Sequence, residues 1–335
     1  MRKRVAITGI AGFLGSWIAE ALMHKYEIIG FDNLTGGDAR NVPRAIPDEN
    51  WYAMDCQDLR PEHLAGCDTL YHCAALAHEG LSVFSPRTIT DSIFGASVAA
   101  FSAAVAAGVR RIIYCSSMSR YGIGAPPFVE SENPSPVDPY GIAKVAAEDV
   151  LKNLSAVHGV EYIIAVPHNI VGERQKYDDP FRNVASIMAN RMLQGQPPII
   201  YGDGTQVRCF SDVRDDIPVF VKMMEYPDHN LVCNVGPDEE WVTINKLADM
   251  LRKHIPEAPK TNLYYRDRPQ EVKMAVCSAD KARRIYGYKT NYLLDETLRS
   301  LVLHIRERGT RPFEYHLPVE IESGKTPETW TEQLI

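Results

Sequence analysis

Short apolar runs alternate with longer stretches of helical periodicity along the first half of the chain. Runs rich in Val, Ile, Tyr and Phe are typical of buried strands, whereas apolar positions at helical spacing indicate helices. Strands are expected at residues 5–8, 27–31, 51–54, 69–72, 111–115 and 161–166. Helices are expected from the glycines after the first strand to about residue 22, over about 89–107, and over 139–157. Strands that alternate with helices imply parallel pairing, so the predicted fold class is α/β with a doubly wound parallel sheet.

The alternation of predicted strands and helices becomes less regular after about residue 172, where proline pairs and tight turns separate shorter elements. Residues 1–172 therefore form the predicted first domain, to which the chain returns around 205–235. Residues 173–310 form mainly a smaller C-terminal α/β domain. Residues 311–335 lack a strong periodicity and are expected to lie over the surface or to contact a partner.

The chain carries 36 basic and 43 acidic residues, a formal net charge of −7. Nucleic-acid binding depends on clustered Lys and Arg, so this balance argues against a nucleic acid as the main partner. The 7 cysteines are an odd number with no C-x-x-C pair, which predicts free thiols, a reducing cytoplasmic location and no metal site. No run reaches about 18 uninterrupted apolar residues, so no membrane span is expected. The basic N-terminus leads into too short an apolar run for a signal peptide.

A glycine-rich loop follows the first predicted strand and opens the first helix. Gly9, Gly12 and Gly15 are spaced G-x-x-G-x-x-G, with Phe13 and Leu14 at the start of the helix. Such a loop turns tightly, lets the backbone approach a pyrophosphate and offers the unpaired N–H groups of the helix start to the anion. The sequence therefore predicts a dinucleotide-binding site, the alternative being a glycine-rich turn without a ligand.

Asp32 comes at the end of the second predicted strand. An acidic residue at this place can accept hydrogen bonds from the diol of a ribose. Asn33, and not an arginine, follows it, so no adjacent cation pairs a 2′-phosphate and NAD is favoured over NADP. Arg40 and Arg44 lie further on and leave NADP open. The alternative for Asp32 is a turn aspartate without a ligand.

Tyr140 and Lys144 lie four positions apart at the start of a predicted helix, so their side chains share one face. A free phenol has a pKa of about 10, and a nearby ammonium or a positive nicotinamide ring favours the phenolate, which is the better base. Tyrosine and lysine at this spacing are common by chance. This pair, however, opens the helix after the fifth predicted strand, whose end carries Ser116 and Ser117. The carboxyl ends of such strands face the cofactor crevice, which indicates a catalytic site.

These motifs together make the chain resemble the extended short-chain dehydrogenase/reductases, in particular the NAD-dependent nucleotide-sugar epimerases and dehydratases of the UDP-glucose 4-epimerase type. The resemblance rests on the glycine triplet, Asp32-Asn33-Leu34, Ser116-Ser117 with Tyr121-Gly122, and Tyr140 with Lys144, and it extends over about residues 4–305. It implies a Rossmann-type fold, NAD bound by the first domain, and a nucleotide-diphosphate sugar bound mainly by the second. It also implies a homodimer formed by the helices near 89–107 and 140–158, where an alanine-rich face permits close packing; packing of that face within the chain is the alternative.

The resemblance assigns roles to individual residues. It implies that Ser117, Tyr140 and Lys144 are catalytic. For NAD it implies Gly9, Gly12, Phe13, Leu14, Gly15, Asp32, Asn33, Asp55, Cys56, Ala74, Tyr140 and Lys144. For the substrate it implies His78, Asn169, Arg208, Arg268 and Glu271. Two guanidinium groups neutralise a diphosphate well, although taken alone both arginines would be interpreted as surface charges and His78 as a structural histidine.

The residues after Ser117 bear on the reaction. By the resemblance, 4,6-dehydratases carry an Asp-Glu pair at the places of Met118 and Ser119, and UDP-glucuronate decarboxylases carry a glutamate at the place of Ser119; neither residue is acidic here. Enzymes that epimerise C3 and C5 carry a cysteine near Ser119. The remaining chemistry is reversible oxidation at C4, which predicts a 4-epimerase. The alternatives are an NAD(P)-dependent reductase or dehydrogenase of a 4-keto nucleotide sugar and a non-catalytic NAD-binding regulator.

Several positions depart from the pattern of the family. Ser92 replaces an asparagine, Pro167-His168 replaces an aromatic pair, and Arg120 replaces an aliphatic residue. Ala275 stands where some UDP-galactose epimerases have a tyrosine, which would leave room for an N-acetyl group. Asp216 is expected to cap a helix that starts near residue 217 and so to be structural.

Overall fold

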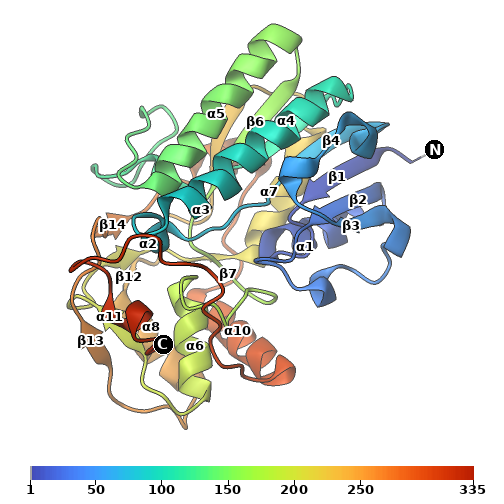
Figure 1. Cartoon of the computed structure of the whole chain (residues 1–335). Helices are drawn as coiled ribbons and strands as arrows, with labels where there is room; N and C mark the ends of the chain where they lie inside the picture. Colours follow the sequence, from blue (N-terminus) through green and yellow to red (C-terminus); the bar gives the residue numbers. More distant parts are fainter. Residues whose placement is uncertain (1) are drawn as a thin grey trace.

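The computed structural model describes residues 2–335, and its central element is a seven-stranded parallel sheet (Figure 1). The strands are β1 (Arg4–Thr8), β2 (Glu27–Asp32), β3 (Trp51–Ala53), β4 (Cys67–His72), β5 (Arg111–Cys115), β6 (Glu161–Pro167) and β11 (Leu231–Val235). Their order is β11-β6-β5-β4-β1-β2-β3, and every neighbouring pair is parallel. The six strands predicted from the sequence and the doubly wound α/β class are confirmed.

The order of the strands places a crevice at the carboxyl ends of β1 and β4. The chain proceeds from β1 outward to β2 and β3, and then crosses to β4 on the other side of β1. Two loops that leave neighbouring strands in opposite directions open a crevice between them, and ligands of doubly wound sheets bind there.

Alternation of side chains along the strands produces two core layers. Ile113 and Cys115 of β5 pack into one layer, with helices α1 (Phe13–Leu22), α7 (Val213–Glu225) and α9 (Asp280–Tyr286). Ile112 and Tyr114 pack into the other, with α4 (Ala96–Ala106) and α5 (Pro139–His158). Successive residues of a strand point to opposite faces, so a run that is apolar throughout is buried on both sides.

The predicted helix over about 89–107 is the end of a longer helical stretch. The chain turns through α3 (Pro86–Thr90) and a π-helical segment, η5 (Asp91–Gly95), directly into α4. The whole stretch, Pro86–Ala106, is one helix that is long and apolar enough to cross a membrane, with a mean hydropathy of 1.5. A core helix passes the same test, and α4 packs its buried face on the sheet.

A second group of elements lies beside the carboxyl edge of the sheet (Figure 1). Its helices α6 (Val184–Leu193), α8 (Ile244–His254) and α10 (Leu294–Arg308) share a separate apolar core. Its small sheets pair β7 (Ile170–Val171) with β10 (Ser211–Asp212), β9 (Val207–Arg208) with β12 (Val242–Thr243) and β14 (Met274–Ala275), and β8 (Ile199–Tyr201) with β13 (Leu263–Tyr265). Between these elements the chain returns to the large sheet with α7 and β11.

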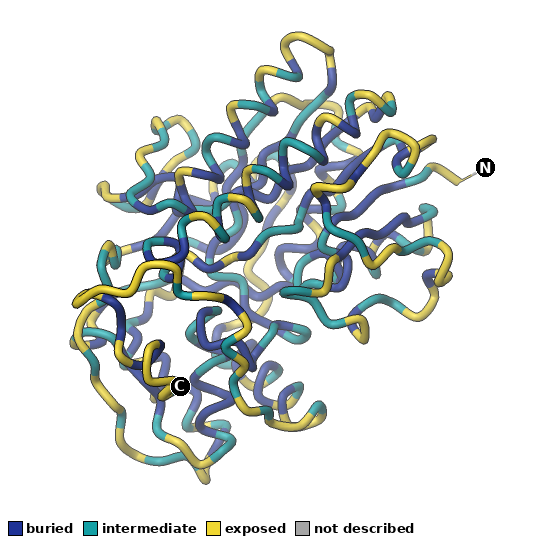
Figure 2. Tube along the Cα trace, in the orientation of Figure 1, coloured by how far each residue is buried: buried dark blue, intermediate teal, exposed yellow. Residues whose placement is uncertain are grey.

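The C-terminal segment 311–335 crosses from this second group to the helices α2 (Glu79–Ser82) and α3. The Ser85 Oγ donates to the Pro318 carbonyl at 2.5 Å, and the Ile321 N–H donates to the Phe84 carbonyl at 2.8 Å. Trp330, in α11 (Glu328–Thr331), packs edge-on against Phe84 and Phe181. Much of the segment is exposed, as Figure 2 shows.

Short 3₁₀ turns are η1 (Ala39–Asn41), η2 (Asp48–Asn50), η3 (Cys56–Asp58), η4 (Pro61–Leu64) and η6 (Met118–Arg120).

The prediction that Asp216 caps a helix is wrong. Helix α7 begins at Val213, and Asp212 is its N-cap, since the Asp212 carboxylate accepts from the Arg214 N–H at 2.8 Å. Asp216 lies in the first turn, is fully buried and accepts a hydrogen bond from the Ser211 hydroxyl. Burial raises its pKa well above the ordinary value. Aspartates stand at positions 212, 215 and 216, and the first of them takes the cap.

Candidate active site

The glycine loop lies at the crevice and is too crowded for side chains. Gly9 has φ +73°, and a Cβ added there would lie 2.9 Å from the Ala74 nitrogen. A Cβ at Gly15 would lie 2.1 Å from the Gly9 carbonyl oxygen. Gly12 is the N-cap of α1, whose first residues are Phe13 and Leu14. The chain therefore keeps a bare backbone concavity at a helix start, which suits a phosphate group.

Asp32 lies against this loop. Its carboxylate accepts hydrogen bonds from the Ala11 N–H at 2.9 Å and the Leu34 N–H at 2.8 Å. Burial raises the pKa of Asp32, and these hydrogen bonds partly offset that increase. The neighbouring Asn33 donates to the Asp55 carboxylate at 2.7 Å. The structure thus brings the predicted residues of a dinucleotide site to one edge of the sheet, with the Gly9 loop between Asp32 and Ala74.

Cys56 follows Asp55 at the start of η3 and is buried. Burial raises the pKa of the Cys56 thiol to about 12, so the thiol is uncharged. Among residues 2–335, no group of three or more His, Cys, Asp or Glu side chains is arranged to hold a metal ion.

Ser117, Tyr140 and Lys144 meet where β5 ends and α5 begins. Tyr140 is in the first turn of α5, after the N-cap Asp138, and Lys144 follows one turn later. The Lys144 ammonium donates to the Cys115 carbonyl at 2.7 Å and lies 5.8 Å from the centre of the Tyr140 ring. Burial lowers the pKa of Lys144 to about 8. The predicted catalytic set is therefore assembled.

In the chain without NAD, the pKa of the Tyr140 phenol is not lowered. The pKa of Tyr140 lies above its ordinary value, chiefly because the ring is buried. A hydrogen bond with Ser117 opposes this increase, whereas the carboxylates of Glu79 and Asp138 add to it. The ammonium of Lys144 is directed to the Cys115 carbonyl and is not among the leading influences on the phenol. Forming the phenolate requires further positive charge nearby.

A buried ion pair, which the sequence did not reveal, supports this site from behind. Glu148 on α5 accepts from the Ser116 hydroxyl at 2.5 Å and from the Arg120 guanidinium through two bonds of 3.0 Å each. All three side chains are nearly or fully buried. Arg120, noted as a departure from the family pattern, is thus the partner of a carboxylate one helical turn beyond Lys144.

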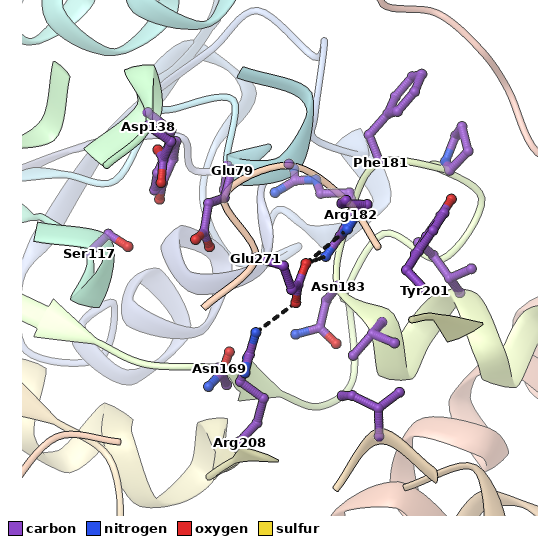
Figure 3. Close-up of a pocket in the computed structure, with 18 of the residues that line it drawn as sticks. Glu79, Ser117, Asp138, Asn169, Phe181, Arg182, Asn183, Tyr201, Arg208 and Glu271 are labelled. Carbon is purple, nitrogen blue, oxygen red and sulfur yellow. Dashed lines mark hydrogen bonds and ion pairs between the residues drawn. The ribbon is translucent and has the colours of Figure 1, made fainter. Parts of the chain in front are cut away.

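A cavity of about 360 Å³ opens next to Ser117 and Tyr140. Figure 3 shows Ser117 and Asp138 on one side of it and Arg208, Glu271 and Tyr201 on the other. Asn169 also lines it, and its side-chain amide donates to the Cys209 carbonyl at 3.0 Å. The cavity therefore joins the catalytic set to the residues predicted to bind the substrate.

Glu271 holds the two predicted phosphate-binding arginines together. The Arg208 guanidinium donates to one oxygen of Glu271 at 2.7 Å, and the Arg268 guanidinium donates to the other at 2.5 and 3.0 Å. Although burial would raise the pKa of Glu271, the two guanidinium groups lower it. Glu271 is therefore a counter-ion between the arginines in the chain by itself.

His78 does not reach the cavity, contrary to its predicted role in substrate binding. Its ring is fully buried, and its Nε2 lies 2.8 Å from the Asp179 carboxylate. Burial lowers the pKa of His78, with Asp179 partly compensating. The residue that faces the cavity is the next one, Glu79. A lone histidine in a loop gives no signal of burial, which explains the error.

Four further residues line the cavity that the sequence did not reveal: Glu79, Asp138, Arg182 and Tyr201. A signal existed for Asp138, because an aspartate before a proline is typical of a helix start. Its carboxylate accepts from the Gly141 N–H at 2.8 Å. No local pattern marks the other three, which come from separate parts of the chain.

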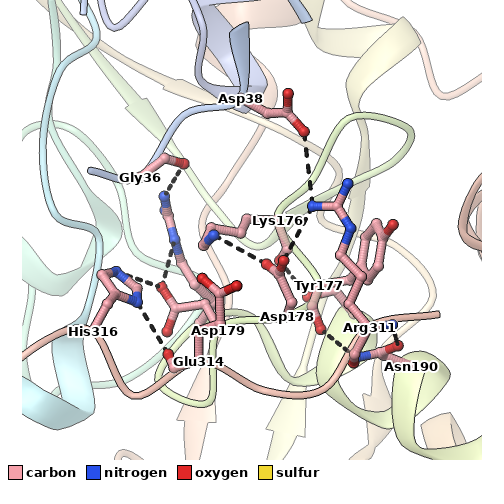
Figure 4. A network of polar contacts seen from close by, with 12 residues as sticks. Gly36, Asp38, Lys176, Tyr177, Asp178, Asp179, Asn190, Arg311, Glu314 and His316 are labelled. Carbon is pink, nitrogen blue, oxygen red and sulfur yellow. Dashed lines mark hydrogen bonds and ion pairs between the residues drawn. The ribbon is translucent and has the colours of Figure 1, made fainter. Parts of the chain in front are cut away.

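A polar network beside the cavity involves the C-terminal segment (Figure 4). The Arg311 guanidinium lies 3.2 Å from Asp178, which also pairs with Lys176 at 3.1 Å. Arg182 donates to the Gly36 carbonyl at 3.2 Å and lies 3.7 Å from Asp179. The loop after Asp32, the loop 174–182 and the C-terminal segment are thereby tied together.

Comparison with known proteins agrees with this geometry. Residues 5–236 match the model of the NAD dependent epimerase/dehydratase family. A putative UDP-glucose 4-epimerase of Methanocaldococcus jannaschii is 29% identical over 89% of this chain and 97% of its own length. A UDP-N-acetyl-alpha-D-glucosaminuronate decarboxylase of Bacillus cytotoxicus is 28% identical over 72% of this chain and 77% of its own. The solved UDP-N-acetylglucosamine 4-epimerase of Methanobrevibacter ruminantium M1, in complex with UDP-N-acetylmuramic acid, superposes with a TM-score of 0.85 at 28% identity, covering 92% of this chain and 99% of that one.

Gly15→Ala should weaken NAD binding. The added methyl group would lie 2.1 Å from the Gly9 carbonyl oxygen, so the loop must move. Overpacking of this kind costs about 1–3 kcal/mol, which corresponds to roughly tenfold or more in affinity. Calorimetric titration with NAD measures the change. Gly324→Ala is the control, since Gly324, like Gly15, lacks a positive φ and its Cβ would meet nothing within 4 Å. Unchanged affinity in Gly15→Ala would place NAD elsewhere.

Arg120→Leu and Glu148→Leu should each destabilise the fold, because each leaves a buried charge without its partner. A loss of about 3–5 kcal/mol in the free energy of unfolding is expected for each single variant. The double variant should recover much of that loss, since it removes both charges. Urea unfolding of the four proteins measures the coupling. Additive losses in the double variant would show that the pair is not energetically linked.

Proposed function

The chain belongs to the NAD dependent epimerase/dehydratase family, and we propose that its reaction is the interconversion of C4 epimers of a nucleotide-diphosphate sugar. NAD is its cofactor, and enzymes of this kind act on nucleotide sugars. The observation that carries the proposal is the placement of Ser117 and Tyr140 at one end of a cavity whose other end holds Arg208 and Arg268. A diphosphate at the arginines directs the attached sugar toward the phenol.

The residues of the chain perform the proton chemistry of this reaction. Tyr140 takes the proton of the C4 hydroxyl, and Ser117, which lines the same cavity, contacts the same oxygen. NAD, when bound, supplies a hydride acceptor and donor and a positive ring. Lys144, fixed by the Cys115 carbonyl, keeps an ammonium beside the phenol. The cavity walls exclude bulk water while the 4-keto sugar rotates, so that the hydride can return to its opposite face.

The neutral residues beside Ser117 support epimerisation over elimination. Met118 and Ser119 supply no carboxylate at the place where the resemblance predicts one for dehydratases and decarboxylases. The structure adds a fact that the sequence comparison overlooked, because Glu79 and Asp138 bring carboxylates to the cavity from other elements. Their oxygens are therefore part of the sugar environment.

A side chamber of about 100 Å³ adjoins the cavity next to Ser117. Ala275, Phe128 and Gly122 are among the residues that line it. The small side chain of Ala275 supports a substrate with a substituent as large as an N-acetyl group. The likeness to a UDP-N-acetylglucosamine 4-epimerase supports the same substrate class.

A homodimer through α4 and α5 is part of this proposal. Four of the six alanines on the expected face, Ala96, Ala100, Ala103 and Ala104, are already buried within the chain. Apolar side chains nearby remain exposed, and they include Phe94 at 38% and Ile142 at 53% exposure. The exposed apolar surface, and not the alanine face, supports the dimer.

Tyr140→Phe should reduce turnover by about 100-fold or more, because the group that takes the C4 proton is lost. Binding of the nucleotide sugar should persist, since the arginine end is untouched. Product formation from UDP-glucose and UDP-N-acetylglucosamine, followed by NMR, measures turnover, and calorimetry measures binding. Full activity would contradict the role of Tyr140. Stoichiometric release of NADH with the sugar would favour the alternative, a nucleotide-sugar dehydrogenase.

Ala275→Tyr should fill the side chamber and discriminate against larger sugars. We expect kcat/KM for UDP-N-acetylglucosamine to fall by about tenfold or more relative to that for UDP-glucose. Ala275→Ser, which barely changes the volume, is the control. Equal losses for both sugars would show that the chamber does not hold the substituent.

A further inference from the structure

Glu79 is the one charged side chain of the cavity wall, within residues 2–335, for which no ion pair or hydrogen bond forms. It opens helix α2, and Figure 3 shows its carboxylate pointing into the cavity. The cations that line the cavity are paired: Lys176 with Asp178, Arg182 with Asp179, and Arg208 and Arg268 with Glu271. Asp138 accepts from the Gly141 N–H. Glu79 therefore offers two free acceptor oxygens to whatever enters.

The place of Glu79 is between the two ends of the cavity. It borders the side chamber together with Ser117 and Asp138, and its neighbour Gly80 lies against Arg268. A Cβ on Gly80 would lie 2.9 Å from the Arg268 guanidinium. A sugar whose diphosphate meets the arginines and whose C4 meets Tyr140 must therefore pass Glu79.

We propose that Glu79 is a specificity-determining residue that accepts hydrogen bonds from the hydroxyl groups of an uncharged sugar and excludes hexuronate sugars. The proposal rests on the proposed function. A hexuronate would bring its carboxylate next to Glu79 and Asp138, where like charges repel. The cations of the cavity cannot relieve this repulsion without giving up their own partners.

The charge on Glu79 changes near neutral pH. Partial desolvation by the cavity walls, together with the carboxylates of Asp138 and Glu271, raises the pKa of Glu79 to about 7. Arg208 and Arg268 act in the opposite direction. Glu79 is therefore charged at pH 8.5 and largely protonated at pH 6, so its discrimination against a hexuronate should weaken as the pH falls.

Glu79→Gln tests the proposal, because it removes the charge and keeps the shape. Dissociation constants and kcat/KM are measured for UDP-glucose and UDP-glucuronate at pH 8.5 and pH 6. The wild type should prefer UDP-glucose at pH 8.5, and the preference should shrink by about tenfold or more in Glu79→Gln. Glu79→Asp, which keeps the charge, should retain the preference. Glu307→Gln, which removes an exposed charge at the end of α10, is the matched control.

The outcomes separate this proposal from the proposed function. If both sugars bind, and the ratio of their dissociation constants changes neither in Glu79→Gln nor with pH, the role of Glu79 is overturned. The proposed 4-epimerase would then be unaffected. A wild-type preference for UDP-glucuronate would also overturn the role of Glu79. If the sugar takes up deuterium from heavy water at C3 or C5, and Glu79→Gln abolishes this uptake, Glu79 transfers protons and the specificity role is wrong. Failure to bind any UDP-sugar would refute the proposed function itself. The pH dependence of the wild type provides the test should Glu79→Gln not fold.

Discussion

A single buried carboxylate, that of Glu148, joins the two segments that carry the reacting side chains. It lies on α5, which also bears Tyr140 and Lys144, and it binds Ser116 and Arg120 at the end of β5. Both attachments are charge-assisted and shielded from water, where such bonds are strongest and hardest to replace. The bond from Lys144 to the Cys115 carbonyl is a second tie across the same junction. The spacing of serine, phenol and ammonium therefore depends on the junction of helix and strand and not on the loops around the cavity.

Charge is distributed unevenly along the cavity, so a charged ligand has a preferred orientation in it. One end contains Asp138 beside the phenol, with Glu79 between the two ends, whereas the basic end contains two arginines and a single carboxylate. A molecule with two negative phosphates and a neutral sugar has the complementary polarity. The reverse orientation would bring the phosphates to the end that contains Asp138, which is unfavourable. Orientation is thus set by charge before any hydroxyl is recognised individually.

The sequence predicted those parts of the structure that depend on local pattern. Strand period, helix period and glycine spacing sufficed for the large sheet, the Gly9 loop and the juxtaposition of Ser117 with Tyr140 and Lys144. The errors concern burial and long-range pairing. His78 and Asp216 are buried among partners that the local sequence does not announce. Glu79, Arg182 and Tyr201 of the cavity wall were missed for the same reason, since they come from separate segments of the chain.

The bond pattern of Glu271 has a consequence for how a ligand enters. With this carboxylate between them, Arg208 and Arg268 are oriented and desolvated in advance, so little side-chain entropy remains to be lost when an anion arrives. In the proposed function, entry of a diphosphate is an ion exchange, in which an external anion displaces an internal one. A weaker anion, with one negative charge, gains little from such an exchange. The arrangement lowers the affinity for anions in general and increases the selectivity for the more highly charged ligand.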